Sequence, residues 1–465
     1  MKTSRRNGLS RRNVIKGAIA IAGVASLQGA APVGAQPAAA TRRDIVSFAQ
    51  KASRLAKFEA AVKEMKARSR TNANDPKGWL VHAKAHADFC SLPNTAANQI
   101  HFCWWFLPWH RAYITVTERK IREISGDPTF AYPYWNWTSD RRIPQAYRSA
   151  GSPLADAVRF TPNRPVDDGE VDFFPNNPTL KQLGVAALAV TAYEATTPGR
   201  INRTLGGIAR PNPANSFGNN RLEGTPHGPI HNYAGGFRTQ DEGGDMTDFE
   251  TAARDPIFFA HHGNLDRLWE IWRKDPARRA TEPTSDAFLK HRFPFPWLDG
   301  TVMQIAVEET LDTLKLGFVY DNMQVTRPGT QAVVVAQAAQ DRLPAVGSGS
   351  VRNPLTPQAA GDERKILEIT EVEPPPRPMT VGVYVKPANA PADDPGVHVG
   401  TFAAVKAGGV IAWPSRTLSF DITDVANRFA GQELTVNLVP YRIRAQGAEE
   451  YPPLRYEAMR IVTER

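Results

Sequence analysis

His227-Gly228-Pro229-Ile230-His231 is the stretch that decides how this chain is interpreted, together with the later segment Asp255-Pro-Ile-Phe-Phe-Ala-His261-His262-Gly-Asn-Leu-Asp266-Arg267. Residues four apart share one face of a helix, with Cβ atoms roughly 6 Å apart, so His227 and His231 can bind one ion together. A third imidazole from the later segment would complete a site made of nitrogen ligands. Such a site suits copper, zinc, iron or nickel better than calcium or magnesium.

A second set of histidines lies upstream, at His86, His101 and His110. A single H-x-x-x-H step is weak evidence for a metal site. Eight of the ten histidines, however, fall into two clusters within sequence rich in Trp and Phe. Two sets of three histidines in one chain therefore predict a pair of metal ions.

The charge of the chain is concentrated at its N-terminus. Six of the nine net positive charges lie in residues 1–40, which contain no acid. The remainder is close to neutral, which gives no electrostatic basis for binding nucleic acid, and we exclude that class. A chain of 465 residues is long enough for more than one domain.

The N-terminus has the three parts of an export signal. Ser10-Arg11-Arg12-Asn13-Val14-Ile15-Lys16 is a twin-arginine sequence, and the apolar run Gly17–Ala25 and small residues up to Ala35 follow it. The apolar run is too short and too rich in Gly and Ala for a membrane span. We expect residues 1–40 to direct export by the twin-arginine route to the periplasm or the cell exterior, with no membrane span in the mature protein.

Apolar spacing predicts a mainly α-helical first domain. Helices are expected over Asp44–Arg68, Gly78–Ala87 and Asp255–Trp272, and another is expected to open at Pro108. Helices that carry inward-facing histidines favour a four-helix bundle with the metal pair in its core. Residues 139–226 are rich in Pro, Asn and Gly and predict long loops, with one helical piece near Thr179–Tyr193.

The pattern changes after residue 302. Residues 336–365 are rich in Ala, Gly, Pro, Ser and Gln and are predicted to be a linker, which bounds a first domain over residues 41–335. Residues 366–465 contain short apolar runs that predict an antiparallel β-sandwich. These runs are Val381–Val385, Val397–Val405, Leu418–Ile422 and Leu434–Val439.

Several longer motifs resemble those of the type-3 copper proteins, which include tyrosinases, catechol oxidases and hemocyanins. The resemblance is strongest to plant-type polyphenol oxidases and their bacterial relatives, and it covers nearly all of the chain after the signal. It rests on Phe106-Leu107-Pro108-Trp109-His110-Arg111, Tyr132-Pro133-Tyr134-Trp135-Asn136-Trp137, Asp255–Phe259 with Asp266-Arg267, Trp297-Leu298-Asp299 and Leu311–Gly317. It implies two copper ions, O₂ as co-substrate, oxidation of o-diphenols to o-quinones and a monooxygenase step on monophenols.

The resemblance also implies the copper ligands. The first copper would be bound by His86, His101 and His110, and the second by His227, His231 and His262. His82 is the alternative to His86, which is favoured because Cys90 follows it by four residues, as in the plant-type pattern. His261, next to the last ligand, is expected to support or line the pocket.

Further roles follow from the resemblance alone. Cys90 would form a thioether with a ring carbon of His101, and Asp266 would orient a ligand histidine through its other ring nitrogen. Glu223 would hold a catalytic water near the second copper. The substrate pocket would include Phe249, Gly228, Asn232 and His261. Several tyrosinases have an asparagine where this chain has Gly228, and that departure argues against strong monophenol hydroxylation.

Other readings stay open at this point. The chain could be a strict catechol or o-aminophenol oxidase, a hemocyanin-like dioxygen carrier, or a structural or zinc-binding protein. Small phenols are the expected partners, with a copper chaperone as a further candidate, and melanin formation is one of several open roles. The C-terminal sandwich is expected either to shield the active site until cleavage near Gly347–Ser350 or to be a fixed stabilising domain.

Overall fold

The computed structural model describes most of the chain after the predicted signal. The described residues are 39–90, 99–137, 139, 142–159, 187–188, 190–196, 203–210, 220–238, 242–324, 347–352, 364–394, 396–412, 417–440 and 451–464. The export signal and most of the predicted helical piece at Thr179–Tyr193 lie outside them. Within the described part, no helix is both long enough and apolar enough to cross a membrane.

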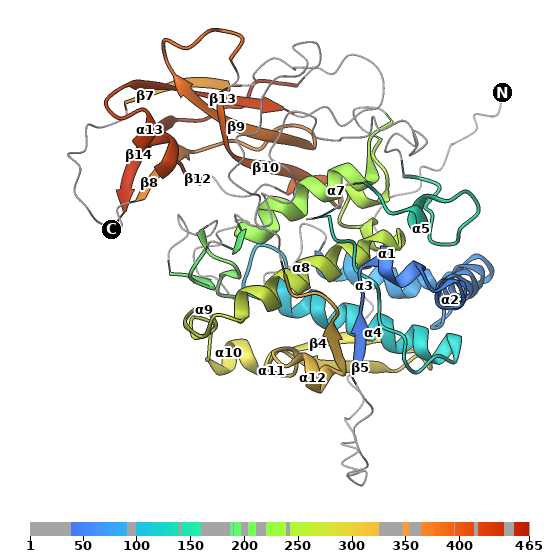
Figure 1. Cartoon of the computed structure of the whole chain (residues 1–465). Coiled ribbons are helices and arrows are strands. Elements are labelled where there is room, and N and C mark those ends of the chain that lie inside the picture. The colour runs from blue at the N-terminus through green and yellow to red at the C-terminus, as the bar shows by residue number, and fades with distance from the viewer. Residues whose placement is uncertain are drawn as a thin grey trace, which may run out of the picture. The chain divides into compact units, whose positions relative to one another are not determined.

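The helical region follows the predicted order, with small shifts at the ends (Figure 1). Its longer helices are α2 (Ala52–Thr71), α3 (Trp79–Cys90), α4 (Phe106–Ser125), α7 (Gly228–Gly235) and α8 (Ile257–Arg273). The short ones are α1 (Ile45–Ala49), α5 (Gln145–Arg148), η3 (Glu223–His227), η4 (Asp245–Thr247), η5 (Ala252–Arg254), α9 (Pro276–Arg279), α10 (Asp286–Leu289), α11 (Val307–Thr310) and α12 (Thr313–Leu316). The helix expected over Asp44–Arg68 is divided into α1 and α2.

Helix α4 is the centre of this region. Pro108 lies in its first turn, where backbone N–H groups have no acceptor within the helix, so the proline loses no hydrogen bond. Gly126 ends the helix in the left-handed conformation at φ 61°. Most of its residues are buried, so it packs on more than one side. Against α8 it places the Arg111 guanidinium 2.5 Å from Asp266 and 2.7 Å from Glu270.

The first described strand closes the helical region by a long-range pairing. β1 (Ala40–Arg42) pairs in parallel with β6 (Phe318–Tyr320). The fully buried Arg42 donates to Glu118 at 2.7 Å and to Asp266 at 2.8 Å, and its guanidinium lies over the Phe318 ring. Two carboxylates therefore neutralise a cation whose burial alone would be costly.

Two antiparallel sheets form the C-terminal region, as the short apolar runs predict. Their strands are β7 (Gly347–Arg352), β8 (Arg364–Thr370), β9 (Met379–Pro387), β10 (Val397–Ala407), β11 (Val410–Ala412), β12 (Leu418–Asp421), β13 (Glu433–Pro440) and β14 (Ala458–Glu464), with the short helix α13 (Thr423–Arg428) after β12. One sheet has the order β11-β10-β9-β13-β7 and the other β12-β8-β14. Alternate residues of β13, such as Leu434, Val436 and Leu438, are buried between them. Outside this region lie the small pairs β2 (Glu194–Ala195) with β3 (Gly207–Ile208) and β4 (Arg292–Pro296) with β5 (Val302–Ala306).

The predicted linker is wrong over its middle part. Residues 347–352 form strand β7, which pairs antiparallel with β13 from Gly347↔Leu438 to Arg352↔Glu433. Backbone pairing needs no apolar side chain, so a Gly- and Ser-rich strand at a sheet edge has the composition of a linker. A cut near Gly347–Ser350 would fall within a paired strand. The other residues of 336–363 lie outside the described part.

Strand β10 belongs to both regions of the fold. Ala403, Val405 and Ala407 are buried in the core of the helical region, whereas Phe402 and Ala404 are buried in the core of the sandwich. Side chains alternate between the two faces of a strand, so one strand can serve two cores. β10 thus lies against α7, the helix that carries His231 (Figure 1).

Candidate metal centre

The first set of histidines comes from three separate segments. His86 lies in α3, His101 lies in the turn before α4, and His110 lies in the second turn of α4. All three are buried, and one ring nitrogen of each lies within 4.8 Å of the others. The structure thus brings the three residues of the predicted first site together.

The second set comes from two segments. His227 ends η3, His231 lies in α7 with its ring centroid 4.4 Å from that of His227, and His261 and His262 lie side by side in α8. The ligand nitrogens of these four buried histidines also lie within 4.8 Å of one another. A helical step of four residues therefore produces the local pair that the sequence predicts.

The two sets face each other. The rings of His110 and His262 are stacked, with centroids 4.0 Å apart and planes 7° apart. The rings of His101 and His227 lie 5.5 Å apart. Two histidine sets whose rings lie this close together could hold two ions in one centre.

Hydrogen bonds fix which nitrogen of each ring faces the centre. Four of the histidines place Nδ1 within hydrogen-bond distance of a backbone carbonyl. The pairs are His86 with Phe249 (2.6 Å), His231 with Met246 (2.7 Å), His110 with Phe106 (2.7 Å) and His227 with Glu223 (3.1 Å). A carbonyl can only accept, so the proton is on Nδ1 and the Nε2 lone pair is free for a metal.

The Nε2 atoms have the environment that metal ligands require. Those of His86, His101, His110 and His227 are buried without a hydrogen-bond partner among the described residues. Those of His231 and His262 lie 3.3 Å from each other. Burial lowers the pKa of these histidines, to about 4 for His231, so the rings are neutral at neutral pH. Buried, neutral and unpartnered nitrogens fit copper or zinc ions.

His82 is not part of the centre. Its Nε2 lies 2.6 Å from the Thr117 hydroxyl, its Nδ1 lies 3.4 Å from Nζ of Lys120, and its ring stacks on Phe259. Both of its nitrogens are therefore engaged one helical turn away from His86. Of the two alternatives for the first ligand, the structure brings His86 to the other histidines.

The Glu223 carboxylate contacts His101 of the first set, whereas the resemblance implies a position near the second copper. This buried carboxylate lies 2.6 Å from Nδ1 of His101 and accepts the backbone N–H of Phe102 at 3.0 Å on each oxygen. Asn220 donates to it at 3.2 Å. Burial raises the pKa of Glu223, and the N–H of Phe102 opposes that shift. Because Glu223 starts the turn that ends at His227, it connects the two sets.

Phe102 is the residue that sequence reasoning missed. Its φ of 61° lies in the left-handed region, which is strained for a non-glycine residue. Its N–H donates to both carboxylate oxygens of Glu223, directly after the ligand His101. A phenylalanine in this conformation leaves no signal in the sequence.

The predicted role of Asp266 is wrong. Its carboxylate accepts from Arg42 at 2.8 Å, from Arg111 at 2.5 Å and from the Tyr320 hydroxyl at 2.5 Å. It therefore neutralises two buried arginines between α4 and α8 and does not orient a histidine. Arg267 has a structural role, since it donates to Asn264 at 2.9 Å and to backbone carbonyls.

Three predicted pocket residues lie close to the centre. Phe249 stacks on His101, with centroids 4.3 Å apart, and lies 5.6 Å from His227. The His261 ring lies 5.6 Å from that of His227, and neither of its nitrogens has a hydrogen-bond partner among the described residues. At Gly228 an added Cβ would lie only 3.1 Å from Cβ of Ala403 in β10.

Asn232, the fourth predicted pocket residue, faces the sandwich instead. Its amide donates to the Ala404 carbonyl at 3.1 Å and to the Thr380 hydroxyl at 3.3 Å. Residue 232 follows His231 on α7, and one helical position turns the side chain by about 100°. The prediction of a substrate contact is therefore wrong for Asn232.

Cys90 is buried at the end of α3 and forms no disulfide with Cys103. The N–H of Ile100 lies 3.4 Å from the carbonyl of Phe89, so the chain before His101 returns to the residue before Cys90. Burial raises the pKa of the Cys90 thiol. The approach of the two segments is compatible with a bond between Cys90 and His101.

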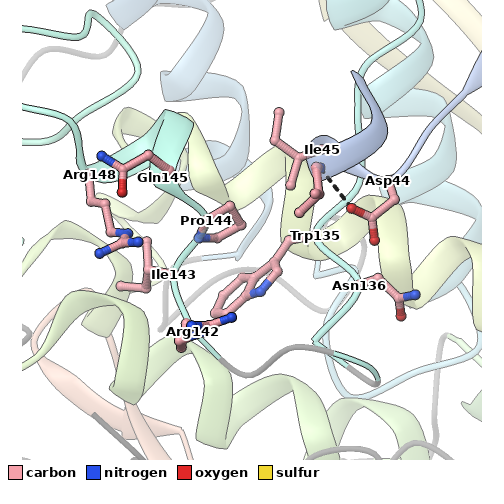
Figure 2. Close-up of a pocket in the computed structure, with 10 residues that line it drawn as sticks. Asp44, Ile45, Trp135, Asn136, Arg142, Ile143, Pro144, Gln145 and Arg148 are labelled. Atoms are coloured by element: carbon pink, nitrogen blue, oxygen red, sulfur yellow. Dashed lines mark hydrogen bonds between the residues drawn. The ribbon is translucent and has the colours of Figure 1, made fainter. Parts of the chain in front are cut away.

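A separate pocket of about 220 Å³ lies beside Trp135 (Figure 2). Ile45, Ile143 and Pro144 supply apolar walls, and Arg142 and Arg148 also line it. No histidine lines it, so the pocket is distinct from the metal centre.

Comparison with known proteins agrees with this geometry. Residues 76–275 match the common central domain of tyrosinase, and this segment contains all the clustered histidines. Residues 76–275 thus carry the central domain of the tyrosinase family, and the sequence around them is similar to polyphenol oxidases.

Similar members of this family come from plants. A chloroplastic polyphenol oxidase of Malus domestica is 32% identical over 263 residues, which are 54% of this chain and 44% of the relative. The (+)-larreatricin hydroxylase of Larrea tridentata is 32% identical over 283 residues, 58% of this chain and 47% of the relative. The chain thus spans about half the length of the curated relatives it matches.

The fold extends over more of the chain than these sequence matches. A structure of latent apple tyrosinase superposes with a TM-score of 0.66 at 24% identity, covering 93% of this chain and 98% of that one. At this identity the likeness establishes the fold. The helical core with a C-terminal pair of antiparallel sheets is therefore an architecture found in this family.

Proposed function

We propose that this protein is a dicopper phenol oxidase that uses O₂ to oxidise o-diphenols to o-quinones. The observation that carries the proposal is the pair of facing histidine sets, whose Nε2 atoms are buried and aimed at one another. Imidazole ligands suit copper, and the match to the tyrosinase domain favours it over zinc. Each o-diphenol would lose two electrons and two protons, so two would be oxidised for each O₂ reduced to two waters.

Copper, when bound, would supply the electron exchange with O₂. His86, His101 and His110 would hold one ion, and His227, His231 and His262 the other. Acceptors at Nδ1 keep the rings oriented without help from the metal. The aromatic rings of Phe249 and Phe258 pack on the histidines and exclude water from the centre. The site is thus organised before a substrate arrives.

His261 is the group best placed beside an incoming phenol. It lies within the second set, its ring is nearly parallel to that of His227, and its nitrogens are free among the described residues. We propose that His227, His231 and His262 bind the metal, while His261 lines the pocket. A free imidazole there can accept the hydrogen bond of a phenolic hydroxyl.

We further propose that monophenols are hydroxylated more slowly than o-diphenols are oxidised. The relative from Larrea tridentata is named a hydroxylase, which supports some monophenol activity within the family. In this chain, however, the Glu223 carboxylate is occupied by Phe102, Asn220 and His101. A carboxylate committed to these donors is less available to position a water that takes a phenol proton.

The test is O₂ uptake by copper-loaded protein with a monophenol and, separately, with the matching o-diphenol. Faster uptake with the o-diphenol is expected, and zinc-loaded protein should be inactive because zinc undergoes no redox change. Equal or faster uptake with the monophenol would overturn the proposed preference. Reversible O₂ binding without turnover of either would instead establish a dioxygen carrier.

We also propose export by the twin-arginine route, on the evidence of Arg11 and Arg12 and the apolar run that follows. Replacing both arginines with lysine should leave the protein in the cytoplasm when cells are fractionated. A lysine variant at Arg5 and Arg6 is the matched control and should still be exported. Normal export of the Arg11 and Arg12 variant would contradict this route.

A further inference from the structure

We propose that the β-sandwich is a permanent part of the metal centre, because strand β10 positions the segment Met246–Phe249, which orients one histidine of each set. A sandwich that only covered the site could be removed with the centre intact. The inference rests on the dicopper site of the proposed function. Its test measures metal retention rather than phenol oxidation, so the two proposals can fail separately.

The first step is that β10 completes the core of the helical region. Ala403, Val405 and Ala407 are at most 3% exposed and are packed with the helices, while the neighbouring residues of the strand face the sandwich. Ala403 and Val405 also lie against Gly228, next to the ligand His227. Removing β10 would expose apolar surface directly beside the second set.

The second step is a backbone connection from the end of β10 to residues 248 and 249. The N–H of Phe249 donates to the Lys406 carbonyl at 2.9 Å, and Asp248 and Lys406 form a parallel bridge. The N–H of Gly408 donates to Oδ1 of Asp248 at 3.0 Å. The Lys406 ammonium lies 3.9 Å from Oδ2 of Asp248. Two hydrogen bonds and one ion pair thus join one end of the strand to a two-residue segment.

The third step is the effect of this segment on the histidines. The Met246 carbonyl accepts Nδ1 of His231 at 2.7 Å, and the Phe249 carbonyl accepts Nδ1 of His86 at 2.6 Å. The Phe249 ring also stacks on His101. The segment that β10 contacts therefore accepts a hydrogen bond from one histidine of each set and packs on a third, His101.

A second connection from the sandwich supports the same helix. Asn232, which follows His231 on α7, donates to the Ala404 carbonyl in β10 and to the Thr380 hydroxyl in β9. Side chains that hold metal ligands in position commonly change metal affinity by 10- to 100-fold when they are removed. The sandwich thus supports His231 in two ways. It contacts the segment whose Met246 carbonyl accepts the His231 ring N–H, and it binds Asn232, the next residue on α7.

The experiment compares Asp248→Ala with a matched aspartate in the sandwich. Asp394 accepts the N–H of Gly396 at 2.8 Å, much as Asp248 accepts that of Gly408, but it lies in a turn between β9 and β10. Copper affinity, measured by competition with a chelator, should fall roughly 10-fold in Asp248→Ala and stay unchanged in Asp394→Ala. Asp248→Asn keeps the Oδ1 acceptor and should restore most of the affinity. Equal affinity in wild type, Asp248→Ala and Asp394→Ala would overturn the proposal.

A second measurement covers the case in which Asp248→Ala does not fold. A protease site inserted between Gln324 and Gly347 allows the folded, copper-loaded protein to be cut once. The sandwich should then stay bound on gel filtration, and denaturant should release copper and sandwich together. A sandwich that dissociates while both copper ions remain on the helical part would show that it is a removable cover.

Discussion

The two histidine sets of this centre are assembled in different ways. The second set contains a pair one helical turn apart, His227 and His231, so most of its geometry is local. The first set joins three segments, and its middle ligand His101 precedes the strained Phe102 and is held by Glu223 from 122 residues away. A local pair needs only a helix, whereas a dispersed set needs tertiary contacts at every ligand. The first set should therefore be the more easily disturbed of the two.

The largest effects are expected from removing one ligand of each set. His101→Ala and His231→Ala should each lower phenol oxidation by more than about 100-fold, beyond what loss of a supporting group causes. Copper analysis should show one ion per chain in both. Loss of both ions in His101→Ala, with one ion kept in His231→Ala, would show that the second set depends on the first. The second set would then not be the more robust of the two.

The next effect is expected from Glu223→Gln. The amide replaces one carboxylate oxygen by an NH₂ group, so one of the acceptors that face Nδ1 of His101 and the N–H of Phe102 is lost, and the first ion should bind roughly 10-fold more weakly. The second ion should be little affected. The exposed Glu250→Gln is the control, and stepwise chelator competition resolves the two ions. Equal weakening of both would show that Glu223 does not act selectively on the first set.

Sequence reasoning reached the fold class and the six histidines for identifiable reasons. Helical spacing indicates α3, α4 and α8, and period-two apolar runs indicate the strands of the sandwich. The structure brings His86, His101 and His110 together, and His227, His231 and His262, as the motifs predict. These features are encoded in residues that are near one another in the chain.

The errors all involve partners that are distant in the chain. Asp266 has the spacing of a residue that orients a ligand, but two arginines, one of them 224 residues away, take up its carboxylate. Asn232 lies beside a ligand, yet two strands, 148 and 172 residues later in the chain, supply its acceptors. Strand β7 has the composition of a linker because its pairing is made by the backbone. None of these choices leaves a local pattern.

The next prediction concerns the intact mass of the protein and is tested with Cys90→Ser. A thioether between Cys90 and His101 would anchor the dispersed set covalently. Its formation is an oxidation that removes two hydrogen atoms, and O₂ present during copper loading would accept them. The intact mass of the wild-type protein after copper loading should be lower than the sequence mass by these two hydrogens, and Cys90→Ser should show no deficit. Cys103→Ser is the control and should retain the deficit. A wild-type mass equal to the sequence mass would rule out the bond.

The smallest effect on the metal is expected from Lys120→Met, beside His82. Burial lowers the pKa of Lys120 to about 7, from 10.5 in an exposed lysine. Between these two pKa values the unfolded chain therefore binds one proton more than the folded protein. The free energy of unfolding of the wild type should then rise by roughly 1.4 kcal/mol per pH unit from about pH 7 to pH 10. Lys120→Met should be more stable than wild type below pH 7, and the gain should vanish near pH 10.

Denaturant unfolding at pH 6, 8 and 10 measures this difference, with the exposed Lys63→Met as the control. Copper content should be unchanged in both variants, because His82 and Lys120 lie outside the two sets. A stability gain that does not depend on pH would show that Lys120 is charged in the folded protein.

The pairing of β1 with β6 has a consequence for the timing of folding. Arg42 is among the first described residues, but its hydroxyl partner Tyr320 is made 278 residues later. At roughly 5–20 residues per second, the ribosome needs about 15–60 s to cover that distance. Glu118 and Asp266 emerge during this interval without a strand to hold Arg42 between them. The helical core can therefore close only after most of the chain has been synthesised, and its first strand is among the last to be put in place.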